Sequence, residues 1–92
     1  MQEVQHDEDQ HKFFVSLGKD EAYLKYKVLP SGDLDFYSTF VPDSGRGMGL
    51  AAKLVLTGFE FAKSNHQKVK PTCSYVAAFF EKNNEWKDLK II

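Results

Sequence analysis

The chain has 92 residues, of which 42% are hydrophobic and 14% aromatic, enough for one small domain with its own core. A net charge of -1 and a sequence pI of about 6.3 argue against a duplex-binding protein, because such domains are usually basic. No apolar run reaches the roughly 18 residues of a membrane helix, and the acidic N-terminal sequence lacks the features of a secretion signal. We therefore expect one monomeric, intracellular domain over residues 1–92, cytoplasmic or nuclear, without membrane or nucleic-acid partners.

The first part of the chain predicts strands. Residues 1–10 are polar and acidic and predict a flexible lead, in which His6 lies at the surface. After this lead, "HKFFVSL" and "EAYLKYKVL" are rich in β-branched and aromatic residues and are separated by the turn-prone "GKDE". A second turn, "PSGD", precedes "LDFYSTFV", which ends before Pro42. We expect an antiparallel meander of three strands.

From Gly49 onward the apolar residues recur at three- and four-residue spacing, which predicts a helix that ends near residues 64–66. "KVKPT" supplies at most a short strand. "CSYVAAFFEKNNEW" predicts a second helix with Ser74 as its cap and with Val76, Phe79 and Phe80 facing the core. The tail "WKDLKII" predicts one turn and a short edge. The order of strand, strand, strand, helix, strand and helix indicates a single domain of the α+β class.

Glycines alternate where the third strand passes into the first helix, in "VPDSGRGMGLAAKLV". The N-terminus of a helix has unpaired N–H groups and the positive end of the helix dipole, so a glycine-rich loop at this place binds phosphate well. A plain tight turn fits the same spacing equally well. The Walker motif is excluded because no Gly-Lys-Ser/Thr follows, and a Rossmann unit is disfavoured because three antiparallel strands precede the loop.

Two segments resemble a known family. "VPDSGRGMGLAAKL" resembles the pyrophosphate loop of the GNAT superfamily of acetyltransferases, in which Arg or Gln is followed by two residues, Gly, one residue, and Gly or Ala. Arg46, Gly49 and Ala51 stand at these positions. "KPTCSYVAAFFEKNNEW" is similar to the Pro-x-Cys-x-Tyr/Phe-Val segment of a short, stand-alone GNAT-like family. The resemblance covers roughly residues 33–89.

This resemblance implies a compact GNAT-like domain whose sheet is splayed between two strands, with acetyl coenzyme A in the splay. It implies transfer of an acetyl group to an amine on a small molecule or a protein. In that family the loop amides hold the pyrophosphate and the preceding strand pairs with the pantetheine arm. The implied cofactor-binding residues are Phe40, Val41, Arg46, Gly47, Met48, Gly49, Leu50, Ala51, Cys73 and Phe80. We expect no metal site, because the three histidines have no ligand partners at metal spacing.

The candidate catalytic residues are Cys73, Tyr75 and Ser38. A thiol at a helix N-terminus has a lowered pKa, so Cys73 is a candidate nucleophile or proton donor, although free cysteines often only pack in the core. Tyr75 is the rival acid, because many GNAT enzymes use a tyrosine hydroxyl. Small members of the family carry His-Thr where this chain has Ser38-Thr39. A serine hydroxyl is not basic near neutral pH, so the base would be a water held by Ser38 or a group elsewhere.

The sequence therefore predicts an acetyl coenzyme A-dependent N-acetyltransferase. The alternative is a non-catalytic acyl coenzyme A-binding module, which the serine in the histidine position favours. A third hypothesis, a sheet that stacks single-stranded RNA on Phe36, Tyr37 and Phe40, is opposed by the element order and by the near-neutral charge.

Overall fold

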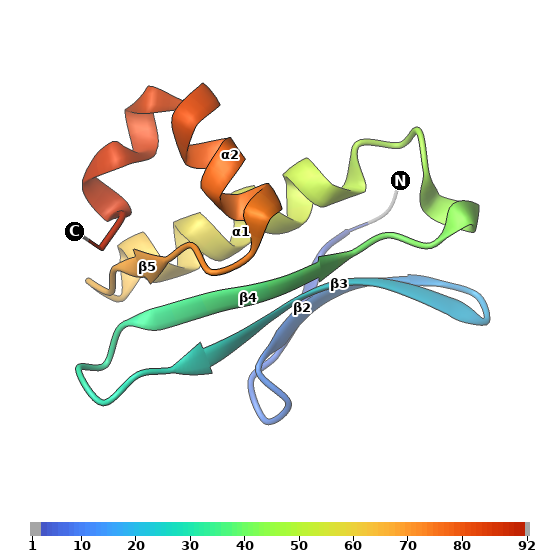
Figure 1. Ribbon diagram of the computed structural model, residues 1–92. Helices are drawn as coiled ribbons and strands as arrows, with labels where there is room; N and C mark the ends of the chain where they lie inside the picture. Colours follow the sequence, from blue (N-terminus) through green and yellow to red (C-terminus); the bar gives the residue numbers. More distant parts are fainter. Residues whose placement is uncertain (1–2, 92) are drawn as a thin grey trace.

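The computed structural model describes residues 3–91 and shows one sheet with both helices on the same side (Figure 1). The five strands lie in the order β1-β2-β3-β4-β5, and all neighbours are antiparallel except β4 and β5. The elements are β1 Gln5–Asp7, β2 Lys12–Leu17, β3 Asp20–Val28, β4 Leu34–Phe40, η1 Asp43–Gly45, α1 Leu50–Ser64, β5 Val69–Lys70, α2 Ser74–Lys82 and η2 Asn84–Leu89. The expected α+β class, the meander and the element order are confirmed.

The core lies between the sheet and α1. Alternate residues of β2, β3 and β4 are buried, and α1 buries residues at three- and four-residue spacing against them. The closest approach occurs at Gly58, where a Cβ atom would lie 2.8 Å from the ring of Phe36. The missing side chain at Gly58 thus lets α1 lie directly over β4. No helix of the described residues is both long and apolar enough to cross a membrane.

The N-terminal segment differs from the expected flexible lead. Residues 5–7 form the edge strand β1, which pairs with β2, whereas residues 1–2 lie outside the described residues. The ring of His6 stacks on Phe13 at 4.1 Å, and its Nε2 lies 2.7 Å from the hydroxyl oxygen of Tyr26. Burial lowers the pKa of His6 below its ordinary value, against the opposing effect of nearby acidic residues. His6 is therefore half-buried and not the freely exposed residue that the sequence predicted, because the rings of Phe13, Tyr26 and Phe61 lie against it.

Strand β4 changes its pairing halfway along. Tyr26 of β3 pairs with Phe36, and its neighbour Lys25 pairs with Ser38. Tyr37 therefore has no partner residue on β3. A residue inserted in this way is a β-bulge, and it reverses the face on which the following side chains lie. On the other side, β4 pairs with β5 only at residues 34 and 35. The two halves of β4 therefore have different surroundings.

The second helix begins one residue earlier than its predicted cap would place it. Cys73, in an extended conformation, is the N-cap residue, and Ser74 is the first residue of α2. Val76 and Phe80 are buried as predicted, and Phe79 is half-buried with its ring edge against Phe59. After α2 the chain continues as η2 and bridges β5 at residue 90, which agrees with the predicted turn and short edge.

Candidate functional site

Residues 37–40, which we call the open half of β4, have backbone groups without partners on one side. The last backbone bond on that side is donated by the N–H of Cys73 to the carbonyl oxygen of Phe36, at 2.9 Å. Beyond it, no backbone hydrogen bond within residues 3–91 joins the open half to the segment that follows β5. An open strand edge of this kind can pair with an extended chain or with an amide-bearing arm. The expected splay of the sheet is therefore present.

The loop that follows β4, residues 45–49, is fixed at its first glycine. Gly45 is buried, and a Cβ atom there would lie 2.7 Å from a methyl group of Leu17 and 2.9 Å from one of Leu50. The hydroxyl of Ser44 donates to the carboxylate of Asp20 at 3.0 Å. These contacts tie the loop to the β2–β3 hairpin. The first of the three alternating glycines is thus required for packing.

The other two loop glycines, Gly47 and Gly49, have positive φ angles of 82° and 69°. A Cβ atom at either position would meet nothing within 4 Å, so both backbones border open space. Within the described part of the chain, the N–H groups of residues 47–49 have no backbone acceptor, and Gly49 is the N-cap of α1 without a side-chain cap. The first N–H groups of α1 are also unpaired, as in every helix. Free amides beside the positive end of a helix are the arrangement that binds anions in proteins.

Arg46 lies between Gly45 and Gly47, with its side chain largely exposed. Its guanidinium lies 3.0 Å from the carboxylate of Asp43, and its Nε donates to the carbonyl oxygen of Val41 at 3.4 Å. An exposed ion pair of this kind contributes little to stability, so the guanidinium is free to turn toward an anion. Met48 is also exposed, whereas Leu50 is buried and offers only its backbone to the loop.

Cys73 lies beside β4, at the N-terminus of α2. Its Sγ lies 3.4 Å from the hydroxyl oxygen of Thr39, and the residue is half-buried. Burial alone raises the pKa of this thiol, but hydrogen bonds to the Thr39 side chain and to the backbone of the first turn of α2 outweigh it and lower the pKa below its ordinary value. The surroundings therefore increase the fraction of thiolate, which is the reactive form of cysteine.

Ser38, predicted as a catalytic position, lies on the opposite face of β4 from Cys73. It pairs with Lys25 on the outer face of the sheet, whereas Thr39 pairs with the fully buried Leu24 on the helix side. Plain alternation from Phe36 would have placed the side chain of Ser38 next to Cys73. The bulge at residue 37 exchanges the two faces and brings Thr39 to the thiol instead.

Two more predicted residues are placed by the structure. Phe80 is 4% exposed and stacks on Phe59 at 4.5 Å, so it belongs to the core and offers no surface to a cofactor. Tyr75 is 39% exposed in the first turn of α2, and its ring lies 6.3 Å from that of Phe79. Its backbone supports Cys73, while its hydroxyl has no hydrogen bond within residues 3–91.

At the end of β4, Phe40 is 45% exposed, and its ring lies 5.5 Å from that of Tyr23 on the outer face of the sheet. Val41 is half-buried and packs against the core. Both residues therefore offer mainly their backbone to a ligand on the open edge of β4.

Comparisons with known proteins identify the family of this chain. The profile of a family described as GCN5-related N-acetyl-transferase matches residues 12–89. Protein NATD1 of Xenopus tropicalis is 32% identical over 82 residues, which cover 87% of this chain and 75% of that protein. Human NATD1 is also 32% identical over 82 residues, which cover 87% of this chain and 73% of that protein.

The fold has a counterpart among solved structures. The NMR solution structure of a GCN5-like protein from Staphylococcus aureus superposes with a TM-score of 0.75 at 24% identity, covering 97% of this chain and 87% of that one. That likeness concerns the fold, while the sequence match extends over the strands, the glycine loop and the cysteine-bearing helix. The chain belongs to the GCN5-related N-acetyltransferase family.

Proposed function

We propose that this chain binds acetyl coenzyme A at the open half of β4 and the glycine loop, and transfers the acetyl group to an amine. The observation that carries the proposal is that three features lie at one end of β4. These are a strand edge without backbone partners, a loop of free amides at a helix N-terminus, and a cysteine thiol with a lowered pKa. Each supplies one part of what the family's reaction requires.

The residues fit the cofactor. Gly47 and Gly49 border open space, and the amides of residues 47–51 would hold the pyrophosphate, with Arg46 as an additional positive charge. The backbone of residues 39–41 would pair with the pantetheine arm. When bound, acetyl coenzyme A supplies an activated thioester, whose acetyl carbon exchanges its bond to sulfur for a bond to the acceptor nitrogen.

Cys73 has two chemically distinct roles open to it in this transfer. As a thiol it can give its proton to the departing sulfur, and as a thiolate it can accept the acetyl group before the amine does. In both roles the Thr39 hydroxyl is a positioning group, because it lies 3.4 Å from the sulfur and can donate to the thiolate. Mass spectrometry after incubation with acetyl coenzyme A distinguishes the roles, since only the second leaves an added acetyl group on Cys73.

A second candidate function is a non-catalytic acyl coenzyme A-binding module. It is favoured by the absence of a base beside the thiol, since among residues 3–91 no histidine or carboxylate makes a hydrogen bond with Cys73 and Ser38 lies on the other face of β4. Both functions share the cofactor site, and they differ only in turnover.

The thiol of Cys73 also bears on the cellular location of the protein. A reactive thiol stays free in a reducing compartment, so we propose an intracellular protein. We also propose that it acts as a monomer on an amine of a small molecule or a protein.

The test combines thermal melting with a transfer assay. A ligand that binds only the folded state adds RT ln(1 + [L]/Kd), which is about 2.7 kcal/mol at a hundredfold excess over Kd. Coenzyme A and acetyl coenzyme A should therefore raise the melting temperature, and acetyl coenzyme A should be consumed in the presence of a panel of amines. A shift without consumption supports the binding module. No shift at millimolar cofactor contradicts both functions.

A further inference from the structure

Cys73 ends a segment, residues 67–73, that leads from the turn after α1 through β5 to the start of α2. The proposed chemistry depends on where this segment holds the thiol. Its strand, β5, has two residues, whereas strands in globular proteins usually have at least about three. Contacts beyond strand pairing are therefore needed to hold Cys73 in place.

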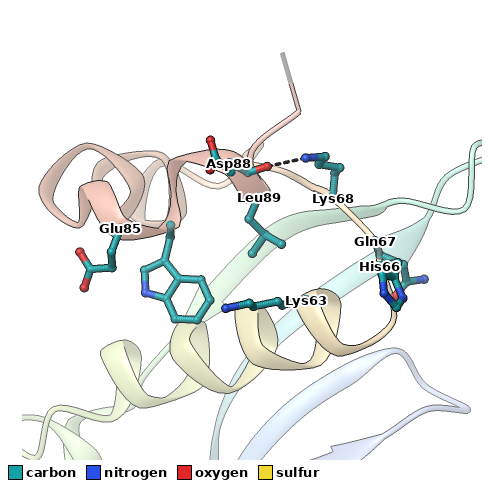
Figure 2. A pocket seen from close by; sticks show the side chains of 8 residues that line it. Lys63, His66, Gln67, Lys68, Glu85, Asp88 and Leu89 are labelled. Carbon is teal, nitrogen blue, oxygen red and sulfur yellow. Dashed lines mark hydrogen bonds between the residues drawn. The ribbon is translucent and has the colours of Figure 1, made fainter.

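The first residues of the segment are held on both sides. On the side of β4, the side chain of Gln67 donates to the carbonyl oxygen of Gly32 at 2.8 Å. The N–H of Lys68 donates to the carboxylate of Asp33, also at 2.8 Å. On the other side, the Nζ of Lys68 donates to the carbonyl oxygen of Asp88 in η2 at 2.5 Å, which Figure 2 shows beside the cavity between α1 and η2. The start of the segment is thus fixed.

The last three residues of the segment have fewer contacts. Pro71 has no N–H to donate, and the N–H of Thr72 donates back to a carbonyl oxygen of β5 at 3.1 Å. Within the described part of the chain, two hydrogen bonds join residues 71–73 to β4, apart from the contact of the thiol itself. The N–H of Cys73 donates to the carbonyl oxygen of Phe36 at 2.9 Å. The hydroxyl of Thr72 donates to the carboxylate of Asp35.

The bond between Thr72 and Asp35 lies on the outer face of the sheet. Asp35 stands between two buried residues of β4 whose side chains face α1, so its own side chain points the other way. The thiol of Cys73 lies on the helix side, where it meets Thr39. Consecutive residues of the segment therefore hold β4 from its two faces, at the place where the splay begins.

We propose that the hydroxyl of Thr72 and the carboxylate of Asp35 are positioning groups that hold the thiol of Cys73 against Thr39. A hydrogen bond to a carboxylate is charge-assisted and directional, so it restricts the segment more than a contact between neutral groups. Thr72 is exposed, so its bond contributes little to the stability of the fold and acts on the position of the thiol. The role in acetyl transfer rests on the proposed function, whereas the reactivity of the thiol is measurable without a cofactor.

The test is alkylation of Cys73 by iodoacetamide as a function of pH, with no cofactor present. Thr72→Val removes the hydroxyl, keeps the shape of the side chain, and leaves Asp35 and its lysine neighbours on β3 and β5 in place. The thiol should lose part of its contact with Thr39, so the midpoint should move to higher pH, and alkylation below the midpoint should slow about threefold. Thr72→Ser, which retains a hydroxyl, should keep the parental midpoint.

Asp35→Ala should move the midpoint in the same direction as Thr72→Val. Ser44→Ala is the matched control, because it removes another exposed hydroxyl that donates to a carboxylate, that of Asp20 at 3.0 Å, and it should leave the alkylation profile unchanged. Circular dichroism establishes that the variants are folded.

An unchanged midpoint in Thr72→Val would overturn the proposal. A shift to lower pH in Asp35→Ala would also overturn it, because the carboxylate would then act on the thiolate through its charge. The expected shifts in a protein that transfers no acetyl group would contradict the proposed function and still support the positioning of the thiol.

Discussion

The two halves of β4 belong to one strand but lie in different environments. Residues 34–36 are paired with β3 on one side and are next to β5 and Cys73 on the other, and their buried side chains pack under α1. Residues 38–40 are paired with β3, and within residues 3–91 no backbone hydrogen bond is made at the second edge of residues 37–40. The bulge at residue 37 separates the halves. We call residues 34–36 the closed half. We infer that the closed half determines stability and the open half determines ligand binding, so substitutions in the two halves should have separable effects.

The largest effect is expected in the closed half, from Phe36→Ala. The ring of Phe36 is fully buried against Gly58 and stacks on Phe59 at 6.0 Å, so its removal leaves a cavity. The free energy of unfolding, measured with urea, should fall by about 3–5 kcal/mol. The coenzyme A affinity of the fraction that remains folded should be unchanged. A loss below about 1 kcal/mol would show that the closed half is not the centre of the core.

The next effect concerns Cys73, at the boundary between the halves. Cys73→Ala and Cys73→Ser should lower acetyl transfer by about a hundredfold or more, because both remove the titratable thiol. Coenzyme A affinity should stay near that of the parent, since the proposed contacts to the pyrophosphate and the pantetheine arm lie at residues 39–41 and 46–51. If Cys73→Ala transfers acetyl at the parental rate, the cysteine only packs, and Tyr75→Phe becomes the variant that identifies the acid.

A smaller effect is expected at the loop that extends the open half. Gly49→Val should weaken coenzyme A binding by about tenfold or more, because its side chain fills the space in which the amides would meet phosphate. Gly32→Val is the matched control, since Gly32 also has a positive φ angle and borders open space, but it lies in the turn before β4. Both variants should lose similar stability, and only the first should lose affinity. Parental affinity in Gly49→Val would mean that the loop is a structural turn.

Arg46→Ala sharpens this test, because it removes a side chain from the same loop without adding one. It should weaken coenzyme A binding less than Gly49→Val, since the guanidinium is exposed and screened by solvent. A larger loss in Arg46→Ala than in Gly49→Val would shift the anion site from the backbone to the side chain.

The smallest effect is expected on the thiol pKa. Thr39→Val removes the hydroxyl that stabilises the thiolate, so the pKa of Cys73 should rise, and the midpoint of iodoacetamide alkylation should move to higher pH. Because the pKa is lowered on folding, the thiolate contribution to stability is present above the ordinary cysteine pKa and is lost as the pH falls through the folded value. Ser38→Ala, on the other face of β4, should leave the alkylation profile unchanged. Identical profiles for Thr39→Val and the parent would contradict the assigned contact.

The sequence predicts what depends on local patterns. The boundaries of α1 follow from its apolar spacing, and the loop of free amides before it follows from glycines at a strand-to-helix junction. It does not predict which of Ser38 and Thr39 faces Cys73, because the answer depends on a bulge that only pairing with β3 creates. The close approach at Gly58 and the burial of His6 likewise depend on residues distant in sequence. Contacts of this kind leave no periodic signal.

Hydrogen exchange with and without coenzyme A tests the division of β4 most directly. We predict slower exchange at the amides of residues 47–52 and along the open half of β4 when coenzyme A is added, since these groups gain acceptors or lose access to water. The amides of residues 34–36, already enclosed, should change little. No protection at the glycine loop under saturating coenzyme A, or equal protection of residues 34–36 and of the open half, would contradict the account.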